Sequence, residues 1–174
     1  MTSVFQASGE ASDAKAEPVV LPASGMVDGD LLVDFNKTVQ DSLQTVKARL
    51  TQLNVILRCD KLPHVEAGAA DMKQLCDKLI HLILHYPPLK SKLFIYIKCN
   101  RLDSEMLPAS LKGRQHAFEI CFHTNSCNDA LWQTAHMQEL NDCARICAQY
   151  AGSFTSAYGH TDCLFKLTLP GKLF

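Results

Sequence analysis

Three polar side chains, Asp77, His81 and His85, stand four residues apart in one stretch of the chain. If this stretch is helical, all three share one face, and two histidines at that interval can chelate a zinc ion. The alternative is a solvated polar face opposite an apolar stripe, because a closed zinc site needs further ligands. Cys121 and His123 form a second arrangement, a thiol and a base two residues apart on an expected strand. The sequence indicates no third group that would orient this histidine.

The eight cysteines of the chain contain no Cys-x-x-Cys pair. Several lie within apolar periodic stretches, as Cys121 does between Ile120 and Phe122. Free cysteine packs as a small hydrophobic residue in a reducing compartment. We therefore expect buried, reduced thiols and neither a disulfide framework nor a metal site.

The composition is that of a globular protein, with 47% apolar and 20% charged residues and a formal net charge of −1. This charge gives no broad basic surface for nucleic acid, and no apolar run has the length of a membrane-spanning helix. The first residues lack the basic and apolar segments of a secretory signal. We expect a cytoplasmic protein with no nucleic-acid or membrane partner.

The chain divides into three parts by its apolar pattern. Residues 1–29 are rich in Ala, Ser, Asp, Glu and Gly and are predicted to form a flexible tail. Residues 30–53 are predicted to form one long helix, capped at its start by Asp28 or Asp30. Residues 54–174 form the predicted globular domain. The long helix has an apolar face with helical spacing that comprises Phe35, Val39, Leu43, Val46 and Leu50.

Alternation and helical periodicity divide the globular part into further elements. Strands are predicted over residues 54–59, 93–100, 116–124, 153–157 and 163–169, with a short extended piece at 63–65. Helices are predicted over residues 70–86 and 129–151, and Gly152 suits the left-handed position after the second helix. This order predicts an α+β fold, a two-layer sandwich with a mixed, mostly antiparallel sheet.

Three segments of this chain resemble the ATPase domain of sensor histidine kinases, whose superfamily includes type II topoisomerases and a heat-shock chaperone. Residues 62–65 (Leu-Pro-His-Val) are similar to the lead into that domain's first helix. Residues 151–154 (Ala-Gly-Ser-Phe) are similar to the turn after its last helix, and residues 163–170 to its closing strand. The resemblance implies the histidine-kinase ATPase fold and a place in bacterial two-component-type signalling.

The nucleotide-binding motifs of that family are missing. If Gln74 is aligned with the start of the family's Asn-x-x-x-Asn motif, Lys78 and Leu82 occupy the two Asn positions, and leucine cannot ligate magnesium. Residues 122–127 replace the Asp-x-Gly-x-Gly motif, and no glycine lies between Gly113 and Gly152. Only a few residues separate Asn125 from the predicted last helix, too few for a nucleotide lid. The resemblance therefore implies a degenerate, catalytically inactive relative, with no catalytic residue, cofactor or metal site.

The long helix resembles the second helix of the dimerisation hairpin that precedes the ATPase domain in these kinases. No histidine precedes His64, so the hairpin's phosphoacceptor is missing. We expect the helix's apolar face to bind a second copy or a signalling partner, and packing onto the chain's own sheet is the alternative. A relic pocket formed by His123, Thr124 and Asn125 that still binds ATP or another small ligand is a second hypothesis. A third is that the chain is a fragment of a split kinase.

Overall fold

A computed structural model describes residues 32–88, 91–107, 109–112, 116–126, 136–159 and 161–172. The flexible tail predicted for residues 1–29 lies outside these ranges. The helices are α1 (Phe35–Thr45), α2 (Lys47–Gln52), α3 (Ala69–His85) and α5 (Met137–Gln149). The strands are β1 (Leu32–Asp34), β2 (Ile56–Cys59), β3 (His64–Glu66), β4 (Phe94–Leu102), β5 (Ala117–Thr124), β6 (Ser153–Tyr158) and β7 (Cys163–Lys172).

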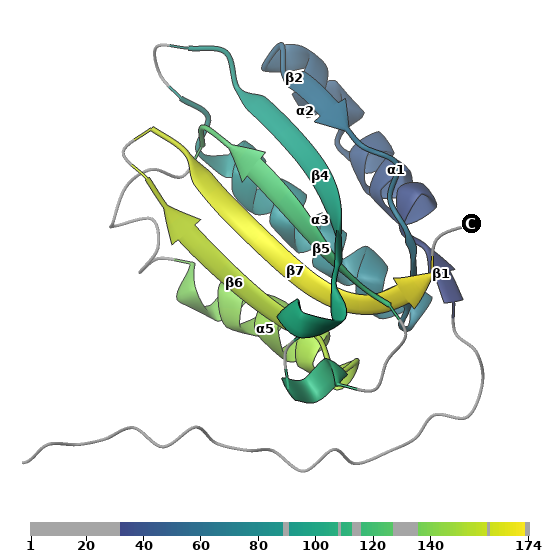
Figure 1. Cartoon of the computed structure of the whole chain (residues 1–174). Helices are drawn as coiled ribbons and strands as arrows, with labels where there is room; N and C mark the ends of the chain where they lie inside the picture. Colours follow the sequence, from purple (N-terminus) through teal and green to yellow (C-terminus); the bar gives the residue numbers. More distant parts are fainter. Residues whose placement is uncertain are drawn as a thin grey trace, which may run out of the picture.

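The strands form one sheet in the order β1-β3-β7-β5-β4-β2, and β6 pairs with β7 beside this path (Figure 1). Only the β2–β4 pair is parallel among these pairings, and all the others are antiparallel. β7 is the strand with most partners, since it pairs with β5 along one edge and with β6 and β3 along the other. The sheet is therefore mixed and mostly antiparallel, as the sequence predicts.

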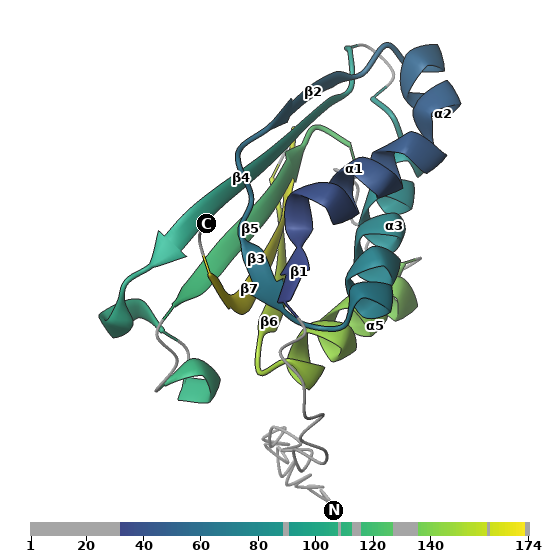
Figure 2. The same ribbon diagram turned by 90° about the vertical axis from the view of Figure 1, so that its right-hand side faces the viewer.

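Helices α1, α3 and α5 lie on one face of the sheet (Figure 2). Alternate residues of the central strands point toward them and join one hydrophobic core, among them Ile95, Ile97, Ile120, Phe122, Phe165 and Leu167. The apolar stripe of α3 packs on the same core, including Leu75, Leu79 and Ile83. This arrangement confirms the predicted α+β sandwich. No helix among the described residues has the length and apolar character needed to cross a bilayer.

The first helical segment differs from the single helix predicted over residues 30–53. Leu32 and Val33 pair with β3 as a strand, and the helix begins at Phe35. Its N-cap is Asp34, whose carboxylate accepts hydrogen bonds from the backbone of Asn36 and Lys37, whereas Asp28 and Asp30 lie outside the described residues. The helix breaks at Val46, just after Thr45, whose hydroxyl donates to the Ser42 carbonyl at 2.7 Å. Such back-bonding competes with the helical ladder and bends helices.

The end of α5 also differs from prediction. The left-handed position is occupied by Ala151, at φ 57°, and not by Gly152. Glycine is needed at 152 for a different reason: a Cβ there would lie 2.3 Å from the Thr168 carbonyl oxygen of β7. The described part of α5 begins at Met137, and residues 127–135 lie outside the described ranges. The start of the helix predicted over residues 129–151, and with it the predicted short connection after Asn125, lies outside the described residues.

Candidate functional site

An ion pair joins α3 to α5 at a position that the resemblance assigns to the nucleotide site. Lys78, at the first Asn position of the family motif, extends from α3 to Asp142 on α5, with Nζ 3.0 Å from Oδ2. The hydrogen bond from Lys78 holds the pKa of Asp142 below its ordinary value. Arg145 adds a second cation, 3.4 Å from the other carboxylate oxygen of Asp142. A lysine whose charge is neutralised by a neighbouring helix is poorly placed to bind a phosphate.

The second Asn position of the motif is occupied by Leu82, whose side chain is only 5% exposed and belongs to the hydrophobic core. A magnesium ion requires oxygen ligands and keeps several waters. A buried leucine supplies neither an oxygen nor access for water. The structure therefore places this position in the interior of the fold.

The N-terminal end of α3 is joined to the end of α5 by Tyr150. Its hydroxyl donates a hydrogen bond to a carboxylate oxygen of Asp71, and a Cβ on Gly68 would lie 2.6 Å from that hydroxyl oxygen. Burial raises the pKa of Tyr150, and the hydrogen bond to Asp71 raises it further. Two side-chain contacts, one at the start of α3 and one near its middle, thus hold α3 against α5. No local sequence pattern predicts either contact, because the partners are 64 and 79 residues apart.

The three residues of the hypothetical relic pocket bind different parts of the chain. His123 donates through Nε2 to the Asp162 carboxylate at 2.7 Å, whereas Thr124 is fully buried and bonds with Ser126. The Asn125 side chain accepts from the Phe94 N–H at 2.9 Å and donates to the Lys92 carbonyl at 3.0 Å. At the position of the family's adenine-binding acid, these side chains are therefore hydrogen-bonded within the chain, Asn125 to the backbone and His123 to a carboxylate.

His123 belongs to an aromatic cluster on the sheet face opposite the helices. Phe94 and Tyr96 of β4 stack with centroids 4.8 Å apart, and His123 meets the Phe94 ring edge-on at 5.3 Å. The guanidinium of Arg58 on β2 lies over Tyr96, 5.5 Å from the ring centroid. Asp162 supplies the orienting group for His123 that the sequence did not indicate. Asp162 lies in the turn before β7, in which the Gly159 N–H donates to the Asp162 carbonyl.

The pair of Cys121 and His123 still lacks an activated thiol. Burial raises the pKa of Cys121 to about 11, and the Glu119 carboxylate adds to this effect. The thiol donates to that carboxylate at 3.6 Å. Since the thiolate is the nucleophile, a thiol protonated at neutral pH does not support cysteine catalysis.

Most of the other described cysteines are buried, as predicted, but Cys59 is exposed and Cys99 is half-buried. All seven described cysteines are free, and five of them are buried: Cys76, Cys121, Cys143, Cys147 and Cys163. Burial raises the pKa of Cys143 and of Cys147 to about 12. These side chains fill the core as small apolar groups.

Asp77, His81 and His85 lie on α3 but make separate contacts. Asp77 pairs with Lys73 at 2.6 Å, and His81 donates through Nδ1 to the Asp77 carbonyl at 2.8 Å. The His85 ring packs against Tyr86, with centroids 4.7 Å apart. Within the described ranges, no three metal-ligating side chains are grouped closely enough to hold a metal ion.

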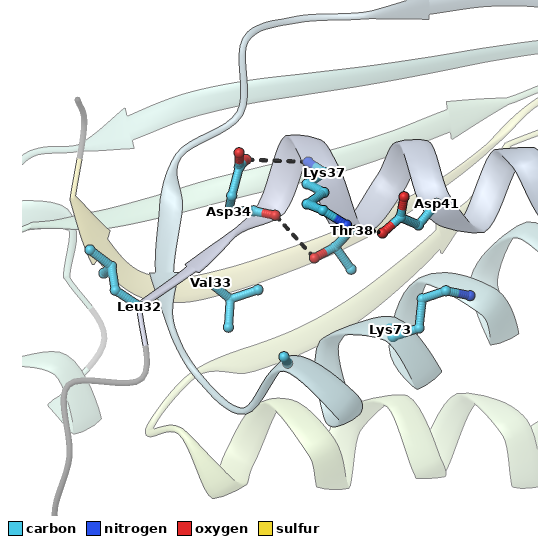
Figure 3. A pocket seen from close by; sticks show the side chains of 8 residues that line it. Leu32, Val33, Asp34, Lys37, Thr38, Asp41 and Lys73 are labelled. Carbon is cyan, nitrogen blue, oxygen red and sulfur yellow. Dashed lines mark hydrogen bonds and ion pairs between the residues drawn. The ribbon is translucent and has the colours of Figure 1, made fainter.

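A hollow of about 390 Å³ lies between β1, α1 and the start of α3 (Figure 3). Its charged lining is already paired: Lys37 with Asp41 at 2.7 Å, and Lys73 with Asp77. Two backbone N–H groups donate hydrogen bonds to the Asp34 carboxylate. Lys73 directly precedes Gln74 of the family motif, but the charged residues that line the hollow offer a ligand no unpaired charge.

The predicted interaction face of the first helix is divided by the structure. Phe35 and Val39 are 0% and 1% exposed and form part of the chain's own core, so they are covered without a partner. Leu43, Val46 and Leu50 are half-buried at the margin of that core. Packing onto the chain's own fold thus accounts for the first half of the face.

No protein-family model and no curated protein matches the sequence. Several solved structures match in fold. The mycobacterial sensor histidine kinase MprB has a TM-score of 0.63 at 9% identity, covering 82% of this chain and 99% of that one. The nucleotide-free catalytic domain of histidine kinase ThkA gives 0.61 at 11%, covering 79% and 92%.

Histidine kinase AdeS of Acinetobacter baumannii matches with a TM-score of 0.58 at 15% identity, covering 80% of this chain. The match spans 66% of the AdeS chain, slightly less than two thirds of it. At such identities the similarity is one of fold and carries no activity with it. The described residues therefore have the fold of the histidine-kinase catalytic domain, which is the fold that the three sequence segments indicate.

Proposed function

We propose that this chain is a catalytically inactive histidine-kinase-like module that acts through protein interaction, as a scaffold in two-component-type signalling. The observation that carries the proposal is the burial of Leu82 at the position of the magnesium ligand. The Lys78–Asp142 ion pair and the backbone-bound Asn125 support it. Each of the three positions that would serve a nucleotide has a role in holding this fold together.

The interaction surface we propose is the margin of the first helical segment. Leu43, Val46 and Leu50 remain half-buried there, beside the exposed polar residues of α1 and α2. A homodimer would cover these three side chains. The partner in a signalling complex would be a second copy or another signalling protein that uses the same margin.

Nucleotide binding is tested by thermal unfolding with ATP, ADP and Mg²⁺. A ligand present at about one hundred times its dissociation constant stabilises a protein by about 2.7 kcal/mol, which raises the melting temperature by several degrees. We expect no shift with any of these ligands. A magnesium-dependent shift would overturn the inactive-module proposal in favour of retained nucleotide binding.

Interaction through the helix margin is tested by light scattering of the wild type and of Val46→Asp/Leu50→Asp. Ala48→Asp is the matched control, since Ala48 lies on α2 between the two sites and is exposed. We expect a dimer for the wild type and the control and a monomer for the double variant. Circular dichroism verifies that all three proteins are folded. A double variant that is folded and still dimeric would contradict the proposed surface.

A further inference from the structure

Strand β2 ends the sheet beside β4, and in the described part of the chain no strand pairs with its other edge. The Ile56 N–H donates to the Leu93 carbonyl and the Asp60 N–H to the Ile97 carbonyl, both at 2.9 Å. In a strand of a parallel pair, the backbone N–H and C=O groups of successive residues point alternately toward the partner strand and away from it. The backbone N–H and C=O groups of Leu57 and Cys59 therefore point away from β4, toward the free edge.

The side chains of β2 are unusual for a free edge. All four residues of the strand are exposed, and Ile56 and Leu57 are 43% and 40% exposed. Natural sheets protect free edges with short strands, charged side chains, Pro or bulges; Ile56–Cys59 is short and carries one charged residue, Arg58, but no Pro. By contrast, the peripheral strand β6 is rich in Ser and Thr. A largely apolar edge with aligned backbone groups is suited to receive another strand.

We propose that β2 pairs in antiparallel orientation with β2 of a second copy of this chain, joining two sheets into one. A twofold axis through Leu57 fits the outward-pointing groups: its N–H donates to the carbonyl of the partner's Leu57, and the reverse bond forms by symmetry. The proposal deepens the proposed interaction function and rests on it, because the short strand alone buries too little area for a stable dimer.

The charge pattern disfavours one neighbouring register. An axis through Leu57 places Ile56 opposite the partner's Arg58, and the aliphatic stem of that arginine can cover the isoleucine. A register centred on Arg58 would set two arginines directly opposite each other, which is destabilising. Within each chain the Arg58 guanidinium already lies over Tyr96, on the side away from the free edge.

On the sheet face that carries the helices, the two paired copies would make further apolar contact. Leu57 lies on the same sheet face as its register partner Ile95, which is buried in the core beneath the helices. Two copies of Leu57 would therefore meet on the side where the half-buried Leu43, Val46 and Leu50 also lie. A second copy of the chain fits this surface, because it carries the same apolar side chains and the contact would remove both sets from water.

The test is analytical ultracentrifugation of the full chain against Leu57→Lys and Leu57→Pro. Lysine places two like charges at the axis, and proline removes the outward N–H without altering the bonds to β4, which use residues 56, 58 and 60. Ala48→Lys is the control of equal charge at an exposed position. We expect the dimer dissociation constant to rise about tenfold or more in both Leu57 variants and to stay unchanged in the control.

A cross-link tests the register and does not depend on how well these variants fold. A hydrogen-bonded antiparallel pair has Cα atoms about 5.5 Å apart, within the range of a disulfide. Leu57→Cys in a Cys59→Ser background is expected to form a covalent dimer on mild oxidation, and Cys59→Ser alone is expected to form none.

The outcomes separate the two proposals. A wild type that stays monomeric overturns both the edge pairing and the helix-margin dimer. A dimer that is lost in Val46→Asp/Leu50→Asp but is unaffected by either Leu57 variant overturns the edge pairing and leaves the helix margin standing. A dimer whose Leu57→Cys variant does not cross-link overturns the proposed register.

Discussion

The Nζ atom of Lys78 lies 3.0 Å from the Oδ2 atom of Asp142, and this ion pair joins α3 to α5 across 64 residues of sequence. In this chain a cation from one helix and a carboxylate from the other neutralise each other at the first Asn position of the family motif. The contact therefore serves to hold the two helices together.

Restoring the family's magnesium ligand by Leu82→Asn is expected to destabilise the protein without creating a metal site. Leu82 is buried, so the change removes packing and leaves a polar amide in the core. We expect a loss of about 3 kcal/mol or more in the free energy of unfolding, measured by urea denaturation. The conservative control is Leu82→Met, for which we expect a loss below about 1.5 kcal/mol. A folded Leu82→Asn variant that gains magnesium-dependent ATP binding would show that the position is accessible.

Removing the Tyr150 hydroxyl by Tyr150→Phe is expected to lower the free energy of unfolding by about 1 to 2 kcal/mol at neutral pH. The pKa of Tyr150 is raised in the folded state, so its contribution is complete below its ordinary value of 10.0 and is lost as pH rises through the folded value. The difference between wild type and variant should therefore shrink only in alkaline solution. Chemical denaturation between neutral pH and strongly alkaline pH measures this, and a constant difference would contradict the assignment.

Residues 151 and 152 are expected to respond in opposite directions. Gly152→Ala places a Cβ against the Thr168 carbonyl and should cost about 2 kcal/mol or more. Ala151→Gly relieves a positive φ of 57° and should stabilise the fold by about 1 kcal/mol. Thermal unfolding of the two single variants gives the comparison. Equal effects of the same sign would show that the backbone at this turn is not as described.

The cap of α1 is expected to show a pH dependence. Burial alone would raise the pKa of Asp34, but the hydrogen bonds from Lys37 and Asn36 outweigh it and hold the pKa below 3.8. Asp34→Ala should therefore lose about 1 kcal/mol at neutral pH. The stabilisation from Asp34 is present above pH 3.8 and is lost as pH falls through the lower folded value. Stability curves of wild type and variant should converge only in acid, and Asp41→Ala is the exposed control on the same helix.

The spacing of apolar residues was sufficient to predict the helices and strands that form the core. The helix expected over residues 70–86 is observed as Ala69–His85, and the strand expected over 116–124 as Ala117–Thr124. In these segments the apolar pattern and the burial coincide, so the local signal is sufficient. The family fold followed from the same order together with three short segments.

The remaining features depend on tertiary contacts that no local pattern encodes. The strand at Leu32–Asp34 arises where the chain pairs with β3. Asn125 and Asp142 are ordinary polar residues in sequence, and their roles come from partners on distant elements. The exposure of β2 was also missed, because its alternating pattern is that of any half-buried strand.

The position of β7 has a consequence for how the protein is made. This strand separates β5 from β6 and β3, so without it the remaining strands fall into groups that share no backbone ladder. Since residues 163–172 leave the ribosome after all the other described strands, the sheet can close only once those residues have been synthesised. Until then, the growing polypeptide carries its apolar strands without their central partner, and it is in this interval that chaperones would be needed most.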